Sequence, residues 1–365
     1  MSDERSHNDT RDETPKDMDT EISSQIQRAK KLAGEGNLED ALREFEDVIE
    51  REPNLSESHK EVGKILFHLN RLEEAKTRLK KAIEIEPTDF EIHLTLADVF
   101  VRLQQDKEAE DEFIEAIKIA PNYAEAYFRY GYFLDSRGRR ADAYDMLAKG
   151  IELDPRGDNG LAMYTCGFFE YELSNRIKSE DRELAEKHYM YAVQSVQEAI
   201  AINPTDSRYY VLLGDIHKEL FQNEEAAESY KRAVTVAPDN EEVRFKYAQF
   251  LGFCLGKWGE AEREFRDLIS HNPNDWRFHK QLSFTLYVQK RYEESISSIR
   301  EAIRIIPEEP ILHFALAEYL VDRETPRKLR NRDEAKKEYE KALHLFRLKG
   351  DEEMIERISK KLKNL

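Results

Sequence analysis

Residues 60–87, KEVGKILFHLNRLEEAKTRLKKAIEIEP, and residues 128–155, FRYGYFLDSRGRRADAYDMLAKGIELDP, follow one pattern that decides the fold. Each stretch has an apolar segment, a polar turn, a second segment that contains Ala, and a closing Pro. The closing prolines recur at intervals of 34 or 35 residues in two series: Pro53, Pro87, Pro121 and Pro155, then Pro204, Pro238, Pro273 and Pro307. This period is typical of arrays in which every repeat is one helical hairpin.

Small residues occupy two fixed positions of the repeat. The eighth position holds Ala29, Gly63, Ala97, Gly131, Gly167, Gly214, Ala248, Ser283 and Ala317. The twentieth position holds Ala41, Ala75, Ala109, Ala143, Ala192, Ala226, Ala261, Ser295 and Ala335. These positions must be small because the two helices of a hairpin cross there, and a larger side chain would push the backbones apart. The closing Pro ends the second helix because its ring cannot continue the hydrogen-bond ladder.

This pattern resembles the tetratricopeptide repeat (TPR) family over about residues 22–345. The resemblance implies an all-α fold, a right-handed α-solenoid (superhelix) of about nine helix-turn-helix repeats across residues 21–349. We expect the repeats near residues 22–55, 56–89, 90–123, 124–157, 160–206, 207–240, 241–275, 276–309 and 310–349. Residues 1–20 are expected to form a disordered acidic tail. Residues 351–365, which follow Gly350, are expected to form a capping helix.

Three insertions interrupt the period. The fifth repeat gains chain around residues 174–190, and we expect this to lengthen both of its helices; it is a partner site or a tolerated loop. The seventh repeat gains one residue at 256–259, and the ninth gains residues around 322–333. The ninth-repeat insertion is rich in cations: Arg323, Arg327, Lys328, Arg330 and Arg332. This set is either a solvated loop or a docking point for an acidic partner segment or the chain's own N-terminal tail.

Composition excludes several functional classes. The 365 residues contain 57 Lys and Arg against 75 Asp and Glu, for a net charge of -18. Because such a surface repels phosphate backbones, we expect no nucleic-acid partner. The first twenty residues carry no apolar core of a signal peptide, and no uncharged run is long enough to span a membrane. We therefore expect a cytoplasmic protein without direct membrane insertion, with Cys166 and Cys254 reduced.

Catalytic motifs are missing from the sequence. There is no glycine-rich phosphate loop, nucleophile elbow or paired-His metal motif, so we expect no enzyme, no catalytic residue, no metal and no cofactor. Four of the ten histidines occupy the fourth position of their repeats: His59, His93, His279 and His313. They are too far apart in sequence to share a metal, and we interpret them as packing residues.

The second, fifth, ninth and twelfth positions of the first helix line the concave face in the TPR family. In repeats one to three these positions include Lys30, Lys60 and Lys64, and from repeat four they become aromatic. We predict a partner-binding groove from the following residues: Phe128, Tyr132, Tyr164, Phe168, Tyr171, Phe245, Lys280, Phe284, Tyr287 and Phe314. The rings could instead pack between neighbouring first helices. We favour the groove for Tyr132, Phe168 and Tyr171, which are expected to converge.

The resemblance also allows particular TPR functions to be tested. The chaperone-binding carboxylate clamp uses Lys or Arg with Asn at the ninth position, and sugar-transferase arrays carry an asparagine ladder. The ninth positions here contain no Asn, so both functions are disfavoured. The sequence predicts a non-catalytic scaffold or adaptor that binds a partner peptide or helix from another protein in its groove. The alternatives are a structural subunit docked through its outer face and, more remotely, a regulatory or catalytic role without a recognisable motif.

Overall fold

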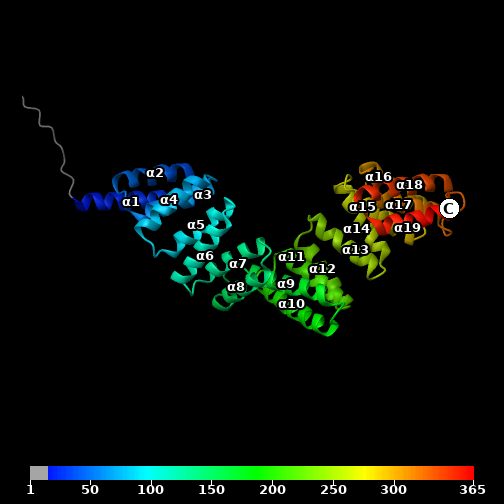
Figure 1. Cartoon of the computed structure of the whole chain (residues 1–365), viewed down its shortest axis with the longest axis horizontal. Helices are drawn as coiled ribbons and strands as arrows, with labels where there is room; N and C mark the ends of the chain where they lie inside the picture. The colour runs from blue at the N-terminus through cyan, green and yellow to red at the C-terminus, as the bar shows by residue number, and fades with distance from the viewer. Residues whose placement is uncertain (1–14) are drawn as a thin grey trace, which may run out of the picture. The chain divides into compact units, whose positions relative to one another are not determined.

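The computed structural model describes residues 15–365, with side chains described from residue 21 onwards. These residues form nineteen α-helices and no strand, which confirms the predicted all-α class for that part of the chain. The helices belong to two compact units, the first ending at Cys166 and the second running from Gly167 to Leu365. Figure 1 shows the helices in chain order, coloured from blue at the N-terminal end to red at the C-terminal end.

The first unit consists of four helical hairpins and the beginning of a ninth helix. Its hairpin helices are α1 (Pro15–Gly34), α2 (Leu38–Arg51), α3 (Ser56–His68), α4 (Leu72–Ile85), α5 (Phe90–Arg102), α6 (Asp106–Ile119), α7 (Ala124–Ser136) and α8 (Arg140–Leu153). The boundary between the units falls inside α9 (Leu161–Ile177). Helix α1 begins inside the expected tail, and the rest of that tail, residues 1–14, lies outside the described residues.

The second unit continues the hairpins and ends in a single helix. Its helices after α9 are α10 (Arg182–Ile202), α11 (Ser207–Glu219), α12 (Asn223–Val236), α13 (Glu241–Phe253), α14 (Trp258–His271), α15 (Trp276–Val288), α16 (Tyr292–Ile305), α17 (Pro310–Val321), α18 (Arg332–Lys349) and α19 (Glu352–Lys363). Each of the nine expected repeat ranges corresponds to one helical pair, although α1 begins at Pro15, ahead of the first expected range.

A short turn reverses the chain inside each ordinary hairpin. Between α3 and α4, Asn70 adopts a left-handed φ of 60°, and the Arg71 N–H donates to the Leu66 carbonyl at 2.8 Å. Gly36 and Gly138 occupy the same turn position with positive φ, which glycine adopts without steric cost. The turn brings the second helix back along the first.

The small positions allow the two helices of a hairpin to approach closely, as predicted. A Cβ atom added at Gly63 would lie 2.5 Å from Leu79 Cγ, and one added at Gly131 would lie 2.8 Å from a methyl group of Leu147. The Cβ added at Gly131 would also lie 3.3 Å from the Ala143 carbonyl oxygen, a backbone atom that cannot easily move aside. The repeat frame therefore depends on the absence of side-chain volume at the crossing.

The insertions change helix and turn lengths locally. In the fifth repeat, α9 has 17 residues and α10 has 21, whereas α11 and α12 have 13 and 14, so the expected lengthening of both helices is confirmed. In the seventh, the turn gains a residue and Gly256 takes a φ of +65°. In the ninth, residues 322–331 form a loop in which Arg330 Nε donates to the Thr325 carbonyl at 2.7 Å.

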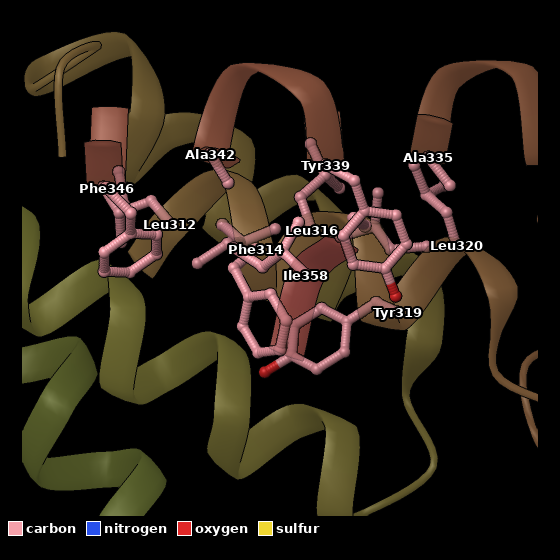
Figure 2. Packing of buried hydrophobic residues seen from close by; sticks show 14 residues of the cluster. Leu312, Phe314, Leu316, Tyr319, Leu320, Ala335, Tyr339, Ala342, Phe346 and Ile358 are labelled. Carbon is pink, nitrogen blue, oxygen red and sulfur yellow. The ribbon is translucent and has the colours of Figure 1, made fainter. Parts of the chain in front are cut away.

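Helix α19 covers the end of the second unit. Gly350 ends α18 in the left-handed region with a φ of 72°, so the chain turns and α19 packs on the hairpin of α17 and α18. Ile358 of α19 is fully buried, and Figure 2 shows it among the side chains of that hairpin. The amphipathic pattern of residues 351–365 thus produces a helix with a buried face, as expected of a cap.

The fourth-position histidines act in packing, as predicted. Nε2 of His59, His93, His279 and His313 lies 2.8–3.1 Å from the carbonyl oxygen of the Pro that closes the preceding repeat. All four side chains are buried. Tyr127 donates its hydroxyl to the Pro121 carbonyl at 3.0 Å in the same way. The position therefore ties consecutive hairpins together.

Candidate functional site

The concave positions of the first three hairpins carry an ion-pair ladder. It consists of Lys30 with Glu57, Lys60 with Asp89 and Glu91, and Lys64 with Glu61 and Glu91, at distances of 2.5–3.4 Å. Most of these pairs join the first helices of successive hairpins, from α1 to α3 and from α3 to α5. The lysines predicted to line this face are therefore neutralised by carboxylates of the same chain.

Asp98 continues this pattern in the first unit. Its carboxylate lies 2.9 Å from Arg129 on α7. Burial raises the pKa of Asp98 to about 6, and the opposite charge of Arg129 only partly counteracts that effect. The concave cations and anions of this unit thus satisfy one another and leave little charge for a partner.

Three predicted groove residues belong to the first unit. Phe128 is 1% exposed, and its ring fills the space beside Gly150, where an added Cβ would lie 2.4 Å from a ring carbon. Its assignment to an open groove is corrected, because the missing side chain at residue 150 lets the ring enter the core. Tyr132 is half-buried and donates its hydroxyl to Asp158, and Tyr164 is half-buried on α9.

Two predicted groove residues of the second unit are also core residues. Phe245 is 7% exposed and contacts the rings of Phe265 and Phe278, with centroids 5.9 and 5.3 Å away. Phe314 is 7% exposed and lies within the cluster shown in Figure 2, with the Arg357 guanidinium of α19 5.0 Å above its ring. Their assignment to an open groove is corrected, because a neighbouring hairpin and the cap cover these rings.

A cavity of about 450 Å³ opens in the second unit, and we call it the Asp215 pocket. Its lining comes from α9, α11, α12 and α13 and the residue that follows α13. The lining residues are Tyr171, Asp215, Lys218, Tyr230, Lys246, Gln249, Phe250, Phe253 and Cys254.

Asp215 organises the polar side of this pocket. Its carboxylate accepts a hydrogen bond from the Tyr230 hydroxyl at 2.5 Å and from the Lys246 ammonium at 2.8 Å. Lys218 is held more loosely, 3.7 Å from Asp215 and 4.0 Å from Glu219. Two cations therefore surround one carboxylate that is already hydrogen-bonded.

Burial and the negative charge of Asp215 act on the tyrosines of the pocket. Burial raises the pKa of Tyr171 to about 12, and the Asp215 carboxylate acts in the same direction. The pKa of Tyr230 is raised by the same two causes. Both phenols therefore stay protonated at neutral pH and keep a hydroxyl proton that can be donated in a hydrogen bond.

The apolar side of the pocket continues into a row of exposed and half-buried rings. Phe253 is 53% exposed and stacks on Phe284 of α15, with ring centroids 5.2 Å apart. Trp258 lies edge-on to both, at 5.6 and 5.8 Å. Lys280 precedes Phe284 by one helical turn and makes no ion pair with any residue from 21 to 365. Large apolar area and an uncompensated cation therefore lie side by side.

The structure brings together only part of the predicted groove. Tyr171 lines the Asp215 pocket, and Phe284 joins it through Phe253. Phe168 is half-buried on α9 outside this lining, and Tyr287 is fixed by stacking on Tyr319 at 4.4 Å. Convergence of Tyr132 with Phe168 and Tyr171 stays a prediction, since Tyr132 belongs to the first unit.

Sequence reasoning missed the residues that make this pocket polar and deep. The rings of Tyr230 and Phe250 lie in tilted contact with centroids 4.9 Å apart, and neither residue was among the predicted groove residues. Lys246 directly follows Phe245, the fifth-position residue that was predicted to line the groove. A small rotation of α13 about its axis places Lys246 in the pocket and Phe245 in the core. A signal was present in the polar set of the sixth repeat, Asp215 and Lys218, which interrupts the aromatic stripe.

The predicted basic patch is partly used by the chain itself. Lys328 pairs with Glu293 at 2.5 Å, and Arg330 donates to carbonyl groups of Arg323 and Thr325 within its own loop. Arg323, Arg327 and Arg332 are exposed. The role of the patch as a docking point stays a prediction.

A second cavity, of about 490 Å³, lies at the fifth-repeat insertion. Lys178, Arg182, Tyr189 and Phe221 are among its lining residues. Phe221 is 76% exposed and adopts a φ of +59° at the turn position that Gly36 and Gly138 occupy elsewhere. A bulky residue in that conformation is strained.

The described residues contain few groups suited to metal binding or thiol chemistry. No group of His, Cys, Asp or Glu side chains among them is arranged to hold a metal ion. Cys254 is exposed at the rim of the Asp215 pocket, and burial of its sulfur raises the pKa of the thiol. Within residues 15–365, no helix is both long enough and apolar enough to cross a bilayer.

Comparison with known families agrees with this architecture. Models of the TPR family match residues 63–104, 90–123 and 124–156, described as TPR repeat and tetratricopeptide repeat. The TPR domain model of cytochrome c-type biogenesis protein H matches residues 170–311. The chain is a tetratricopeptide-repeat protein, as its sequence pattern predicted.

Individual relatives are distant. Human protein O-mannosyl-transferase TMTC1 is 25% identical over 130 residues, which are 36% of this chain and 14% of that protein. Among solved structures, Pseudomonas aeruginosa PilF is 18% identical with a TM-score of 0.49, covering 60% of this chain and 92% of PilF. A human IFIT1 dimer with PPP-AAAA is 20% identical with a TM-score of 0.48, covering 89% of this chain and 73% of IFIT1. The chain spans a small part of the transferase's length.

Proposed function

We propose that this protein is a non-catalytic, cytoplasmic scaffold or adaptor that binds a segment of another protein in the Asp215 pocket. TPR proteins generally mediate protein–protein interaction. The single observation that carries the proposal is the pocket itself, a concave site of about 450 Å³ whose aromatic walls continue into the exposed Phe253. Rings in a concavity supply large contact area at low entropic cost, which is how binding hot spots are built.

Features of the chain favour a protein segment over other ligands. The net charge of -18 opposes a nucleic acid, and the aromatic side of the pocket continues beyond its lining from Phe253 to Phe284. An extended peptide or one helix face can place successive side chains along such a row. A compact metabolite held in the pocket would leave Phe284 uncontacted, because Phe284 lies outside the lining.

The test is selection of a random peptide library on the immobilised full-length chain. We expect enriched peptides whose binding is lost with Phe253→Ala, a change that costs little folding energy because the ring is half in water. Leu348→Ala is the matched control, since Leu348 is 72% exposed and lies far along the chain on α18. Failure to enrich any peptide, or equal binding to both variants, contradicts the proposal.

One observation favours a second candidate, a subunit that also docks through the cavity at the fifth-repeat insertion. A strained, exposed Phe221 beside a cavity is costly unless a partner covers it. Phe221→Gly relieves the backbone strain, so the variant should fold at least as well as the wild type. Co-purification of the full chain from its host should then lose a component that Phe253→Ala retains. An unchanged set of partners removes this candidate.

A further inference from the structure

The Asp215 pocket combines an apolar wall with cations that the chain does not fully use. Lys246 is committed to Asp215 at 2.8 Å, whereas Lys218 lies at the limit of an ion pair, 3.7 Å away. The carboxylate nearest to Lys218 after Asp215 is Glu219, and Glu219 already pairs with Lys178 at 2.7 Å. Lys218 therefore has donor capacity to spare, since an ammonium carries three donors.

The aromatic row has a second cation beside it. Lys280 stands one turn before Phe284 on α15 and has no ionic partner among residues 21–365. Glu242 and Asp275, at the starts of α13 and α15, pair with Arg277 at 3.0 and 2.7 Å. In a chain of net charge -18, Lys280 is therefore a cation beside the aromatic row that no carboxylate of the described residues pairs with.

We infer that the Asp215 pocket recognises a protein segment in which an aromatic or branched aliphatic residue lies close to an acidic residue. This inference rests on the proposed function and specifies its partner. The apolar side chain packs against Tyr171, Phe250 and Phe253, and the acidic side chain accepts from Lys218. Lys280 favours a second acidic residue further along the segment.

Charge complementarity favours an acidic residue of the partner segment over a basic one. A basic residue at the same place would have to compete for Asp215 with Tyr230 and Lys246, which donate to both of its oxygens. Losing the Tyr230 bond would leave the hydroxyl of a buried side chain without its acceptor, and Lys218 and Lys246 would repel a further cation. A carboxylate needs no such exchange, because it adds an acceptor where donors are in excess.

Paired library selections test the inference. The same random peptide library is selected on the wild-type full chain, on Lys218→Glu, and on Lys231→Glu. Lys231 is exposed on α12, so its replacement alters the net charge equally without touching the pocket. We expect wild-type peptides to carry an apolar residue with an acidic neighbour. Lys218→Glu should lose the acidic preference or replace it by a basic one, and Lys231→Glu should keep it.

Two outcomes are separated by this design. Enriched peptides without an acidic preference, or a preference that Lys218→Glu leaves unchanged, overturn the inference while the proposed function stands. No enrichment on any of the three proteins removes the proposed function itself. A single wild-type peptide should bind Lys218→Gln about tenfold more weakly, the scale of one charged hydrogen bond, with an unchanged thermal melt.

Discussion

The concave surface of the first unit and the Asp215 pocket of the second unit are built on the same repeat frame but satisfy their charges differently. In the first unit, Lys60 is 2.7 Å from Asp89, the residue that caps the next first helix, and Lys30 and Lys64 pair with carboxylates of the next hairpin. In the second unit, Lys218 is loosely held and aromatic rings face a cavity. The charges of the first surface are neutralised within the chain, whereas Lys218 of the pocket keeps capacity to bind a further carboxylate.

This difference shows which positions of the repeat carry the fold and which are available for binding. An added Cβ would lie 2.5 Å from Leu79 at Gly63 in the first unit and 2.8 Å from Val196 at Gly167 in the second, so the frame needs a small residue at the crossing in both units. The concave positions vary without breaking that frame, because they lie on the face that the second helix of the hairpin does not cover. Binding can therefore differ along one chain while the fold stays the same.

The largest expected effect on stability concerns the cap of the second unit. Deleting residues 351–365 removes the fully buried Ile358 and exposes Phe314 and the cluster around it, at a cost of about 3 kcal/mol or more. Both tryptophans, Trp258 and Trp276, belong to this unit, so their fluorescence reports its unfolding. We expect the fluorescence midpoint in urea to fall. An unchanged midpoint would mean that α19 does not act as a cap.

The repeat frame of the first unit is tested by Gly131→Leu. The new side chain would meet Leu147 and the Ala143 carbonyl, so we expect a loss of about 1–3 kcal/mol in the free energy of unfolding. Gly259→Leu is the control, because an added Cβ at Gly259 meets no atom within 4 Å. The measurement is urea denaturation followed by circular dichroism. Equal stability of the two variants would contradict the assigned crossing.

A matched pair of lysine variants sharpens the comparison of the two concave surfaces. Lys60→Met breaks the ion-pair ladder and should cost up to about 1 kcal/mol of stability with no effect on peptide binding. Lys218→Met should weaken peptide binding and leave the melt unchanged. Thermal melts and peptide titrations give a melting temperature and a binding affinity for each of the two variants. If Lys60→Met weakens binding as much as Lys218→Met, the contrast between the surfaces disappears.

The smallest effect is a pH dependence at His93. Its ring nitrogens face the Glu112 carboxylate at 2.6 Å and the Pro87 carbonyl at 3.1 Å, and the hydrogen bond to Glu112 raises its pKa. A raised folded-state pKa stabilises the protein fully below about pH 6.5, and this contribution is lost as pH rises through the folded-state value. The stability difference between wild type and His93→Gln should therefore be greater in mild acid than in mild alkali. A difference that grows with pH would contradict the assignment.

Much of the fold was predictable because its determinants are local and repeat. The Pro spacing, the small residues at Gly63 and Gly131, and the fourth-position histidines each act within one hairpin or between neighbours, so the period reveals them. Longer helices in the fifth repeat were predictable from the size of the insertion.

The site was less predictable because exposure depends on helix rotation and on neighbours distant in sequence. Phe128 is buried because Gly150 leaves it room, and Phe314 is buried because the cap covers it. Lys246, one residue after the buried Phe245, lies in the pocket instead. Tyr230 reaches Asp215 from a second helix, a contact that position counting on first helices could not include.

The most direct test of the account is calorimetric titration of a selected peptide against Tyr171→Ala and Phe67→Ala. Both rings occupy concave positions, Tyr171 in the Asp215 pocket and Phe67 in the first unit beneath Arg102 at 5.6 Å. We predict that Tyr171→Ala loses about 2 kcal/mol of binding free energy, the scale of a hot spot, with an unchanged melt, and that Phe67→Ala binds as the wild type does. Binding lost with Phe67→Ala and kept with Tyr171→Ala would contradict the account.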